Sequence, residues 1–404
     1  MLVNVIGLGY IGLPTAVVLA ENGAQVRGVD VVEQVVDSVN AGQVPFVEPD
    51  LAGHLAKALE CGRLTAATKP APAQAFVIAV PTPFLDDHSP DLSYVKAAAE
   101  SIAEYLDDDS LVVLESTSPP GTTRRLAEWV AQRRPDLTGV AYAYCPERVL
   151  PGKVMVELVS NDRVIGGLTP DAAERAAELY GLFCTGQLLR TDATTAELCK
   201  LVENSFRDVN IAFANELSLV SDDLGVDVWE LIELANHHPR VNILQPGPGV
   251  GGHCIAVDPW FIVSADPDNS PLIRTAREVN DGKPKWVVGK VLDAVAGVDA
   301  PTVAALGLSF KPNIDDIRES PARAIVKQLA ERLPHGKILS VEPHLKALPP
   351  DLAALPNVAK CGFRDAVGQA DAVVLLVDHQ AFAGRAAEVP AGVPVIDTRG
   401  QWIR

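Results

Sequence analysis

Long apolar runs and paired cysteines are both missing from this sequence of 404 residues. No apolar stretch reaches the roughly 18 residues that a membrane-spanning helix needs, so no membrane span is expected. The six cysteines are scattered and form no Cys-x-x-Cys pair, which for a chain of this size is typical of reduced thiols in the cytoplasm. The N-terminus leads directly into a strand-like segment, so no signal peptide is expected.

Basic residues are scarce relative to acidic ones. The 34 lysines and arginines stand against 52 aspartates and glutamates, which gives a formal net charge of −18. A surface this negative repels nucleic acid and anionic membranes, so neither is expected as a partner. The net charge does not exclude binding of a small anionic ligand, because a few well-placed arginines can hold one. With 48% hydrophobic and 21% charged residues, the chain is predicted to be globular, with about two or three domains.

Apolar runs of strand length alternate with helical patterns in the first part of the chain. The expected strands are Leu2–Ile6, Gln25–Val29, Phe76–Val80, Leu111–Leu114 and Ala141–Tyr144, and the expected helices are Leu13–Asn22, Leu92–Tyr105 and Thr122–Arg133. This alternation predicts an α/β fold with a parallel sheet and right-handed crossovers. The pattern returns after about residue 300, with expected strands at Thr302–Leu308, Lys337–Val341, Ala372–Val377 and Val393–Ile396.

Between these two regions, neither glycine nor proline occurs from Gly186 to Gly225. The segment Asp192–Leu224 is therefore predicted to form one continuous helix of roughly 50 Å, at about 1.5 Å per residue. Thr194 and Glu197 have the spacing of a capping box at its start. A helix of this length typically connects two domains and offers a dimerisation face.

The segment Gly7-Leu8-Gly9-Tyr10-Ile11-Gly12 lies between the opening strand and a helical pattern, and Asp30 ends the second strand. This context is typical of a dinucleotide-binding Rossmann domain. Gly7 would allow the tight turn, Gly9 the close approach of a pyrophosphate, and Gly12 the packing of helix on strand. A carboxylate at Asp30 would bind the ribose hydroxyls and repel a 2′-phosphate, which favours NAD over NADP.

A glycine-rich run at 245–254 ends in Cys254. Two interpretations stay open: an incidental cysteine in a flexible loop, or a nucleophile presented by backbone that a ligand can approach closely. A zinc site at His253 and Cys254 is not favoured, because adjacent side chains rarely ligate one metal and no partner pair is evident. No metal is therefore expected.

Lys200, Asn204 and Arg207 share one face of the predicted long helix. The simpler interpretation is a solvated polar stripe on an amphipathic helix. The functional one is chemical: an ammonium group beside an amide could stabilise an oxyanion formed when a thiolate adds to a carbonyl.

The order of five segments along the chain resembles that of the UDP-glucose/GDP-mannose dehydrogenase family, over essentially the whole sequence. They are the Rossmann start and the segments Cys145–Gly152, Glu197–Arg207, Gly251–Asp258 and Gly307–Pro312. The resemblance implies an NAD-binding Rossmann domain at 1–185, a central helical dimerisation domain at 186–295 and a UDP-sugar-binding α/β domain at 296–404. It also implies a homodimer.

The activity that this resemblance implies is oxidation of the C6 alcohol of a nucleotide sugar to a carboxylate, a four-electron reaction that uses NAD. Pro-Glu-Arg-Val stands where UDP-glucose-specific members typically have Pro-Glu-Phe-Leu, and the stretch His237–Trp260 favours UDP-N-acetyl-D-mannosamine as the substrate. UDP-N-acetylglucosamine and UDP-N-acetylgalactosamine stay open as alternatives. Polysaccharide biosynthesis is the implied use of the product.

The resemblance also implies roles for individual residues. Cys254 would carry the thiohemiacetal and thioester, Lys200 would act as acid/base with Asn204 as hydrogen-bond donor, Glu147 would assist thioester hydrolysis, and Asp258 would position Lys200 and water. The residues implied for NAD are Gly7, Gly9, Tyr10, Ile11, Gly12, Asp30, Thr82, Thr117 and Arg318. Those implied for the nucleotide sugar are Arg148, Val149, Lys200, Asn204, Arg207, His238, Arg240, Gly251, Phe310, Lys311 and Arg399, with Arg240 reaching across a dimer.

Two functions of other kinds share parts of this pattern. A two-electron dehydrogenase of the hydroxyacid type has a Rossmann start and a long helix, but it needs no cysteine nucleophile. A catalytically silent sensor of NAD or of a nucleotide sugar would have lost part of the catalytic set. All five of its members are present: Glu147, Lys200, Asn204, Cys254 and Asp258.

Overall fold

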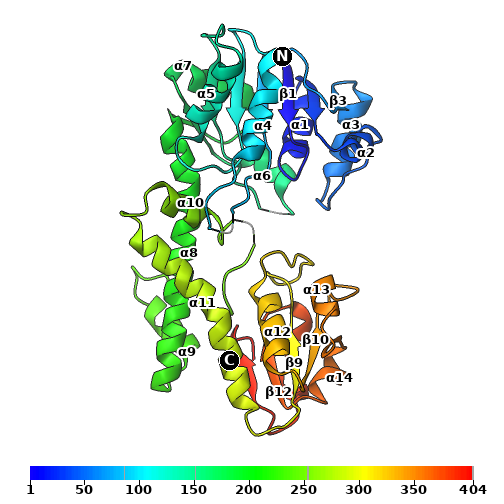
Figure 1. Ribbon diagram of the computed structural model, residues 1–404, viewed down its shortest axis with the longest axis vertical. Coiled ribbons are helices and arrows are strands. Elements are labelled where there is room, and N and C mark those ends of the chain that lie inside the picture. The colour runs from blue at the N-terminus through cyan, green and yellow to red at the C-terminus, as the bar shows by residue number, and fades with distance from the viewer. Residues whose placement is uncertain (86, 151, 253, 403–404) are drawn as a thin grey trace. The chain divides into compact units, whose positions relative to one another are not determined.

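The computed structural model describes residues 1–85, 87–150, 152–252 and 254–402 (Figure 1). The chain divides into two compact units, of which the first comprises residues 1–203 and 264–267 and the second 204–263 and 268–404. Each unit contains its own sheet covered by helices, which confirms the predicted α/β fold. Among the described residues, no helix is long and apolar enough to cross a membrane.

The sheet of the first unit has eight strands in the order β3-β2-β1-β4-β5-β6-β7-β8. The strands are β1 (Leu2–Ile6), β2 (Gln25–Val29), β3 (Leu64–Ala67), β4 (Ala75–Ile78), β5 (Leu111–Leu114), β6 (Ala141–Tyr144), β7 (Arg163–Gly167) and β8 (Leu188–Asp192). All neighbours pair in parallel except β6 and β7, which are antiparallel. The five predicted strands, β1, β2, β4, β5 and β6, all pair in parallel, which confirms the predicted parallel sheet, and the antiparallel pair involves β7, which the sequence did not predict.

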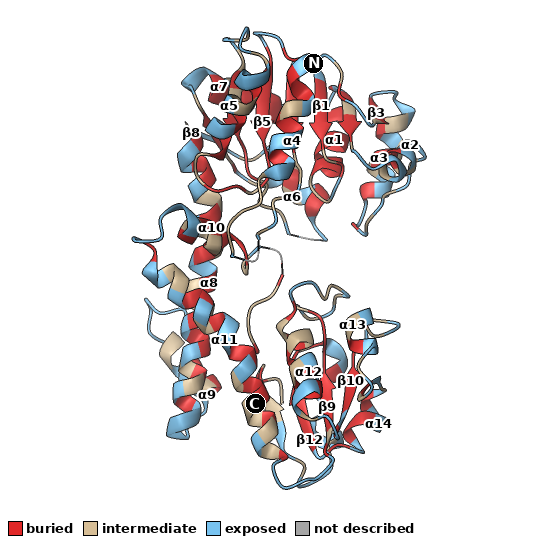
Figure 2. Cartoon of the chain, in the orientation of Figure 1, coloured by how far each residue is buried: buried red, intermediate tan, exposed pale blue. Residues whose placement is uncertain are grey.

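Helices flank this sheet, and its central strands are apolar throughout. The helices are α1 (Gly12–Glu21), α2 (Glu33–Asn40), α3 (Leu51–Glu60), α4 (Ser93–Ile102), η1 (Ala103–Tyr105), α5 (Thr122–Arg133), α6 (Val154–Ser160) and α7 (Pro170–Tyr180). Every residue of β4 and β5 is buried, as expected of parallel strands covered on both faces (Figure 2). The sequence did not predict β3, β7, β8, α2, α3, α6 or α7, whose apolar patterns are shorter or interrupted by exposed residues.

The long helix α8 runs from Ala193 to Leu224 and confirms the prediction of one continuous helix. The predicted capping box is wrong. Asp192 caps the helix instead, because its two carboxylate oxygens accept from the amide of Thr195 at 2.9 Å and from its hydroxyl at 2.6 Å.

Glu197, the other half of that predicted box, stabilises a different helix. Its buried carboxylate accepts from the amides of Gly121 at 2.6 Å and Thr123 at 2.7 Å, where α5 begins. The first amides of a helix lack partners inside the helix and carry partial positive charge, so a carboxylate there is favourable.

The second unit joins a helical layer to a five-stranded parallel sheet. The helical part contains most of α8 with α9 (Val228–Asn236), α10 (Asp258–Ala265) and α11 (Pro271–Ala294). Polar side chains buried between α8 and α11 pair with one another: Asp208 with Arg277, Asn215 with Asn280, and Ser218 with Lys283.

The sheet of this unit has the order β11-β10-β9-β12-β13. Its elements are β9 (Thr302–Leu306), α12 (Pro321–Arg332), β10 (Lys337–Val341), α13 (Pro350–Ala353), β11 (Val358–Lys360), α14 (Phe363–Val367), β12 (Ala372–Leu375), η2 (Gln380–Phe382), η3 (Ala386–Glu388) and β13 (Val395–Asp397). The four predicted strands are present, but β9 and β12 each end two residues early. At β9 the cause is Gly307, whose φ of +99° turns the chain out of the sheet.

Candidate active site

The glycine segment after β1 forms a tight turn that leads into α1. Gly7 has a φ of +93° and donates its amide to the Val29 carbonyl at 2.7 Å. A Cβ on Gly9 would meet nothing within 4 Å, whereas one on Gly12 would overlap the Gly7 carbonyl oxygen. The backbone is therefore open at Gly9 and closed at Gly12, which fits a pyrophosphate lying against Gly9 at the start of α1.

Asp30 is held next to this turn, at the end of β2. Its Oδ2 accepts from the amide of Leu8 at 3.0 Å, and its Oδ1 accepts from that of Val32 at 3.0 Å. At the same edge of the sheet, after β4 and β5, the hydroxyl of Thr82 donates to the Thr117 carbonyl at 2.6 Å. The structure thus brings Asp30 to the glycine turn and joins Thr82 to Thr117, while Ile11 directly precedes α1.

The hydroxyl of Tyr10 has a structural partner that the sequence did not indicate. It donates to the carboxylate of the buried Glu48. Glu48 also accepts from the amides of Gly152 and Val154, each at 2.9 Å. Tyr10 and Glu48 therefore fasten the start of α6, which comes after the segment containing Glu147.

Glu147 lies just beyond β6, at the edge where parallel sheets place their sites. Its side chain is 7% exposed and forms an ion pair with Arg163 of β7 at 3.0 Å. Its other oxygen accepts from the amide of Arg148 at 2.6 Å. The guanidinium of Arg163 in turn lies over the ring of Tyr180, 4.7 Å from its centre. Arg163 therefore fixes the place of the Glu147 carboxylate.

Behind this ion pair lies a second, fully buried carboxyl group, that of Glu115. It accepts hydrogen bonds from Tyr180 at 2.7 Å and from Thr15 at 3.2 Å. Burial raises the pKa of Glu115 to about 7, against the favourable charge of nearby Arg163. Burial also raises the pKa of the Cys145 thiol to about 12, so Cys145 is unsuited to act as a thiolate.

Arg148 and Val149 differ in what they offer a ligand. The guanidinium of Arg148 forms an ion pair with Glu203 of α8 at 2.8 Å and also donates to the Asp162 carbonyl at 3.2 Å. Val149 is partly buried against the core of the first unit. The Arg148 guanidinium thus already has two protein partners. A ligand that bound Arg148 would have to share the guanidinium with them.

In the second unit, the helix α8 and the cysteine loop meet through Asp258. The buried carboxylate of Asp258, the first residue of α10, accepts from the side-chain amide of Asn204 at 2.5 Å. The backbone amide of Asp258 donates to the Cys254 carbonyl at 2.9 Å. Cys254 is exposed, and Lys200 lies one helical turn before Asn204 on α8. One carboxylate therefore connects the loop that carries the thiol to the helix that carries the amide.

The loop leading to Cys254 is held by the buried Asn215. Its Oδ1 accepts from the amide of Gly247 at 2.8 Å, while its amide group donates to Asn280 of α11 at 2.8 Å. Gly249 and Gly252 have φ values of +141° and +87°, which favour glycine over any other residue. These bonds and turns hold the described part of the loop before His253 against α8 and α11.

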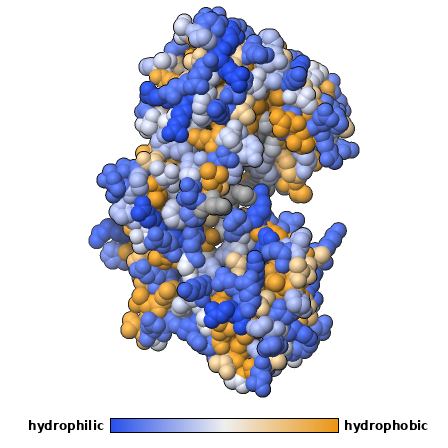
Figure 3. Space-filling model, viewed as in Figure 1, coloured by the Kyte–Doolittle hydropathy of each residue, from blue (hydrophilic) through white to orange (hydrophobic). Residues whose placement is uncertain are grey.

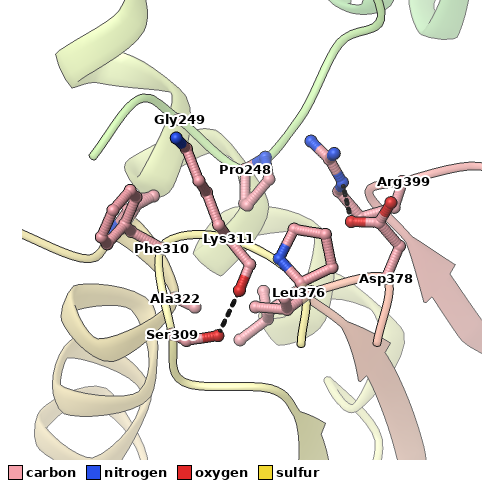
Figure 4. A pocket seen from close by; sticks show the side chains of 12 residues that line it. Pro248, Gly249, Ser309, Phe310, Lys311, Ala322, Leu376, Asp378 and Arg399 are labelled. Carbon is pink, nitrogen blue, oxygen red and sulfur yellow. Dashed lines mark hydrogen bonds and ion pairs between the residues drawn. The ribbon is translucent and has the colours of Figure 1, made fainter. Parts of the chain in front are cut away.

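A small, open pocket lies inside the second unit, between this loop and the ends of β9 and β12 (Figure 4). Phe310, Lys311 and Arg399 line it together with Pro248 and Gly249. Figure 4 shows the Lys311 side chain extending between Phe310 and Pro248. Two of the side chains that line this pocket, Lys311 and Arg399, are cationic, which suits a diphosphate.

One acidic residue also lines the pocket: Asp378, which holds Arg399 by an ion pair of 2.8 Å. Gly251 lies against Phe310, because a Cβ on Gly251 would come within 3.0 Å of the Phe310 Cβ. The structure therefore brings together Phe310, Lys311, Arg399 and Gly251, as the sequence predicted for one substrate site.

Four further predicted side chains are exposed and do not line this pocket, as far as the described residues show: Arg207, His238, Arg240 and Arg318. Arg318 pairs with Asp316 at 2.6 Å. His253, the other residue of the disfavoured zinc interpretation, lies outside the described residues.

Sequence reasoning missed Arg163 and Asp378, and also Glu342 after β10 and His379 after β12, whose side chains lie 3.1 Å apart next to the pocket residues Ser309 and Asp378. Only Glu342 had a signal, since it directly follows the predicted strand Lys337–Val341 just as Asp30 follows Gln25–Val29. The other three are single polar residues whose partners lie far away in the sequence.

Comparison with known proteins agrees with this arrangement. Residues 1–184, 194–282 and 304–404 match the NAD binding, central and UDP binding domains of the UDP-glucose/GDP-mannose dehydrogenase family. The chain is 56% identical to the NDP-N-acetyl-D-galactosaminuronic acid dehydrogenase of Ralstonia nicotianae, over 99% of this chain and 96% of that protein. It is 55% identical to the UDP-N-acetyl-D-mannosamine dehydrogenase of Escherichia coli, over 99% of both.

A solved structure is also similar over nearly the full length. The UDP-D-ManNAc dehydrogenase of Pyrococcus horikoshii has a TM-score of 0.88 and 37% identity, over 99% of this chain and 95% of that one. The glycine turn with Asp30 and the separate cationic pocket are the parts of an NAD-dependent dehydrogenase that acts on nucleotide sugars. The chain belongs to the UDP-glucose/GDP-mannose dehydrogenase family.

Proposed function

We propose that the enzyme oxidises UDP-N-acetyl-D-mannosamine at C6 to UDP-N-acetyl-D-mannosaminuronic acid, in two successive two-electron steps. The observation that carries this proposal is the link from Cys254 through Asp258 to Asn204, one turn from Lys200. It provides a thiol, a carboxylate, an amide and an ammonium group, which is the set that oxidation beyond an aldehyde needs.

Two features of the first unit fit NAD as the cofactor: the open backbone at Gly9 and the carboxylate of Asp30. NAD, when bound, takes up a hydride in each of the two oxidations. The residues assigned to its site are Gly7, Gly9, Tyr10, Ile11, Gly12, Asp30, Thr82, Thr117 and Arg318. The first eight lie in the first unit, and Arg318 lies in the second.

Cys254 forms and later breaks the only covalent bond to the substrate. The first oxidation converts the C6 alcohol to an aldehyde, and the thiolate of Cys254 adds to it as a thiohemiacetal. Loss of a second hydride gives a thioester, which water cleaves to the carboxylate and the thiol. Lys200 exchanges the C6 hydroxyl proton and compensates the oxyanion, with Asn204 as donor.

Two carboxylates assist these steps. Asp258 holds Asn204 and positions Lys200 and water, while Glu147, held by Arg163, orients the water that cleaves the thioester. The remaining residues assigned to the nucleotide sugar are Arg148, Val149, Arg207, His238, Arg240, Gly251, Phe310, Lys311 and Arg399. Of these, the three that line the pocket, Phe310, Lys311 and Arg399, would hold the UDP part.

UDP-N-acetyl-D-galactosamine is the second candidate substrate, with UDP-N-acetylglucosamine behind it. The relative from Ralstonia is named for galactosaminuronic acid and is as similar to this chain as the mannosamine enzyme of Escherichia coli. An NADH-release assay with the three UDP-N-acetylhexosamines and UDP-glucose in parallel decides among them. Highest kcat/KM with any sugar other than UDP-N-acetyl-D-mannosamine would overturn the first choice.

Domains, assembly and location complete the proposal. We assign an NAD-binding domain to 1–185, a dimerisation domain to 186–295 and a UDP-sugar-binding domain to 296–404, which the segments of the family match support. A cytoplasmic enzyme in polysaccharide biosynthesis fits the reduced cysteines and the product. The catalytic assignment leaves the two-electron dehydrogenase and the silent sensor as the alternatives to be tested.

A homodimer would cover an apolar row on α8. Phe206, Phe213, Val220 and Leu224 are 68%, 52%, 48% and 72% exposed. Because they are spaced by about two turns and one turn of the helix, they lie on the same face of α8. Leu231 and Leu234 of the adjoining α9 are also exposed, and Figure 3 shows apolar side chains on the surface over α9. Contiguous exposed apolar side chains of this kind often mark protein–protein interfaces. A monomeric mass by light scattering at assay concentration would contradict this assembly.

Single-turnover absorbance tests the covalent mechanism most directly. The parent enzyme should release two NADH for each UDP-sugar consumed. Cys254→Ala should release at most one per site, because the first hydride transfer needs no thiolate, and Cys254→Ser should stop steady turnover. Lys200→Ala should slow every step. If Cys254→Ala still makes the carboxylate and releases two NADH, the thioester mechanism is wrong. If the parent enzyme releases no NADH with any of the sugars, the catalytically silent sensor is the remaining hypothesis.

A further inference from the structure

His379 is a fully buried histidine that none of the proposed steps uses. It lies after β12, next to the pocket residue Asp378, and its exposed fraction is 0%. Its ring contacts the chain segment at 308–313, which we name the substrate loop because it carries Phe310 and Lys311.

The hydrogen bonds of His379 indicate which ring nitrogen accepts and which donates. The amide of Asn313 donates to Nδ1 at 2.9 Å, so Nδ1 carries no proton. The neutral ring then carries its proton on Nε2, which lies 3.1 Å from the Glu342 carboxylate and 3.3 Å from the Ser309 hydroxyl. The imidazole therefore accepts from the amide of Asn313, at the C-terminal end of the substrate loop. It donates to the carboxylate of Glu342, which binds the N-terminal end of the same loop.

Asn313 needs such a partner because its backbone is strained. Its φ of +63° is in the left-handed region, which costs free energy for a residue other than glycine. The contact is reciprocal, since the amide of Gln380 donates to the Asn313 side-chain oxygen at 2.9 Å. Two adjacent residues, His379 and Gln380, therefore hold Asn313 in this conformation.

Glu342 holds the other end of the substrate loop. Its carboxylate accepts from the amides of Leu308 at 2.7 Å and Ser309 at 3.3 Å. Although burial favours the neutral acid, hydrogen bonds from His379 and from the amides of His344 and Leu308 hold the pKa of Glu342 below its ordinary value. The Ser309 hydroxyl also donates to the Lys311 carbonyl at 2.7 Å, a bond visible in Figure 4.

We propose that His379 is a positioning residue for the nucleotide: it joins the two ends of the substrate loop, keeps Phe310 and Lys311 at the pocket, and thereby sets the affinity for UDP. Lys311 carries its charge on a flexible side chain, so its reach depends on a fixed backbone. The inference rests on the proposed function, because it takes UDP as the ligand of this pocket.

Two conservative variants separate the two hydrogen bonds of the ring. The amide nitrogen of His379→Gln can occupy the place of Nε2 and donate to Glu342, but it leaves Asn313 without an acceptor. The side-chain oxygen of His379→Asn can occupy the place of Nδ1 and keep the bond to Asn313. His335→Gln, at an exposed position between α12 and β10, is the matched control.

The measurements are hydrogen exchange of residues 308–313, the Kd of UDP by calorimetry, and steady-state kinetics. In His379→Gln we expect faster exchange in the substrate loop and about tenfold weaker UDP binding, the effect of roughly one hydrogen bond. The KM for the UDP-sugar should rise by a similar factor, while the KM for NAD stays at the parent value and kcat changes by less than about threefold. His379→Asn should lose less affinity than His379→Gln, and His335→Gln should match the parent.

A purely structural role predicts a different result. If both His379 variants unfold at a lower temperature but keep the parent Kd for UDP and the parent KM, the positioning role is overturned. Unchanged exchange of the substrate loop in His379→Gln overturns it as well. A parent enzyme that does not bind UDP overturns the proposed function together with this role, whereas a parent that binds UDP and variants that bind it equally overturn the role alone.

Discussion

The two units begin their sheets with the same turn. The amide of Gly7 donates to the Val29 carbonyl at 2.7 Å, and the amide of Gly307 donates to the Val341 carbonyl at 2.8 Å. Both glycines have left-handed φ values, +93° and +99°. The strand order around the turn is also shared, β3-β2-β1-β4-β5 in the first unit and β11-β10-β9-β12-β13 in the second.

The chain beyond the turn differs between the two units. In the first unit, α1 begins at Gly12 and the carboxylate of Asp30 remains partly exposed. In the second, α12 begins only at Pro321, and the equivalent carboxylate of Glu342 is buried against His379. The first turn can therefore offer a helix N-terminus and a ribose acceptor, whereas the second offers a loop with a lysine. One backbone turn thus serves two ligand chemistries, according to the length of chain before the helix.

The largest effect in this comparison should come from Gly12→Ala. The new Cβ would overlap the Gly7 carbonyl oxygen, so we expect a loss of about 3 kcal/mol in the free energy of unfolding and loss of NAD binding. Gly9→Ala is the matched control, because nothing lies within 4 Å of its Cβ position. It should keep the parent melting temperature and still weaken NAD. Equal melting temperatures for the two variants would contradict the distinction between a packing glycine and a ligand glycine.

Each unit also buries an ionisable side chain whose pKa burial moves to about 7: upward for Glu115 in the first unit and downward for Lys283 in the second. Burial raises the pKa of Glu115 in the first unit from 4.5 to about 7. The folded state then keeps a proton that the unfolded chain releases, so the stability contribution is present below pH 4.5 and is lost as the pH rises to about 7. The loss is about 3 kcal/mol. Urea unfolding from about pH 4 to about pH 8 should show it in the parent and not in Glu115→Gln.

The second unit should respond in the opposite sense, at higher pH. Burial lowers the pKa of Lys283 from 10.5 to about 7, against the favourable charge of Asp222. Between these values the unfolded chain binds a proton that the folded state does not, so stability should rise with pH from about 7 to 10.5. Lys283→Met should flatten this rise. A parent stability that falls with pH in this window would show that Lys283 is charged in the folded state.

Lys311→Met should come next, with UDP binding weakened about thirtyfold. The charge-assisted hydrogen bond to a diphosphate is worth about 2 kcal/mol, and the loop backbone that presents it stays intact. NAD affinity should not change, because the glycine turn of the first unit serves that ligand. Lys337→Met, at the exposed start of β10, is the control for charge. Calorimetry with UDP and with NAD separates the two sites, and a parallel loss of both affinities would count against separate sites.

Asp30→Ala should have the smallest effect, about a tenfold rise in the KM for NAD. The carboxylate accepts from Leu8 and would bind the ribose, so its loss removes contacts from one end of the cofactor only. The preference for NAD over NADP should weaken, and more so with an arginine added nearby. UDP binding should match the parent. An unchanged ratio of kcat/KM for NAD and NADP would refute the role given to Asp30.

The local features of this protein could be predicted from its amino-acid sequence. The glycine turn with Asp30, the strands β1, β2, β5 and β6, and the long helix α8 were all predictable, because each depends on residues close together in the chain. The position of Glu147 beyond β6 came from the same local pattern. The cysteine loop was recognisable as a unit, since its glycines stand next to one another.

Contacts between residues far apart in the chain could not be predicted and are visible only in the folded protein. Glu197 has the spacing of a capping box for its own helix. Its carboxylate instead binds the amide of Thr123 at the start of α5, 74 residues earlier in the chain. His379 and Glu342 are separated by 37 residues, and Arg163 of β7 pairs with Glu147, although the helix α6 lies between them in the chain. Such pairs form because a buried polar group must find a partner, and packing rather than spacing determines which partner is within reach.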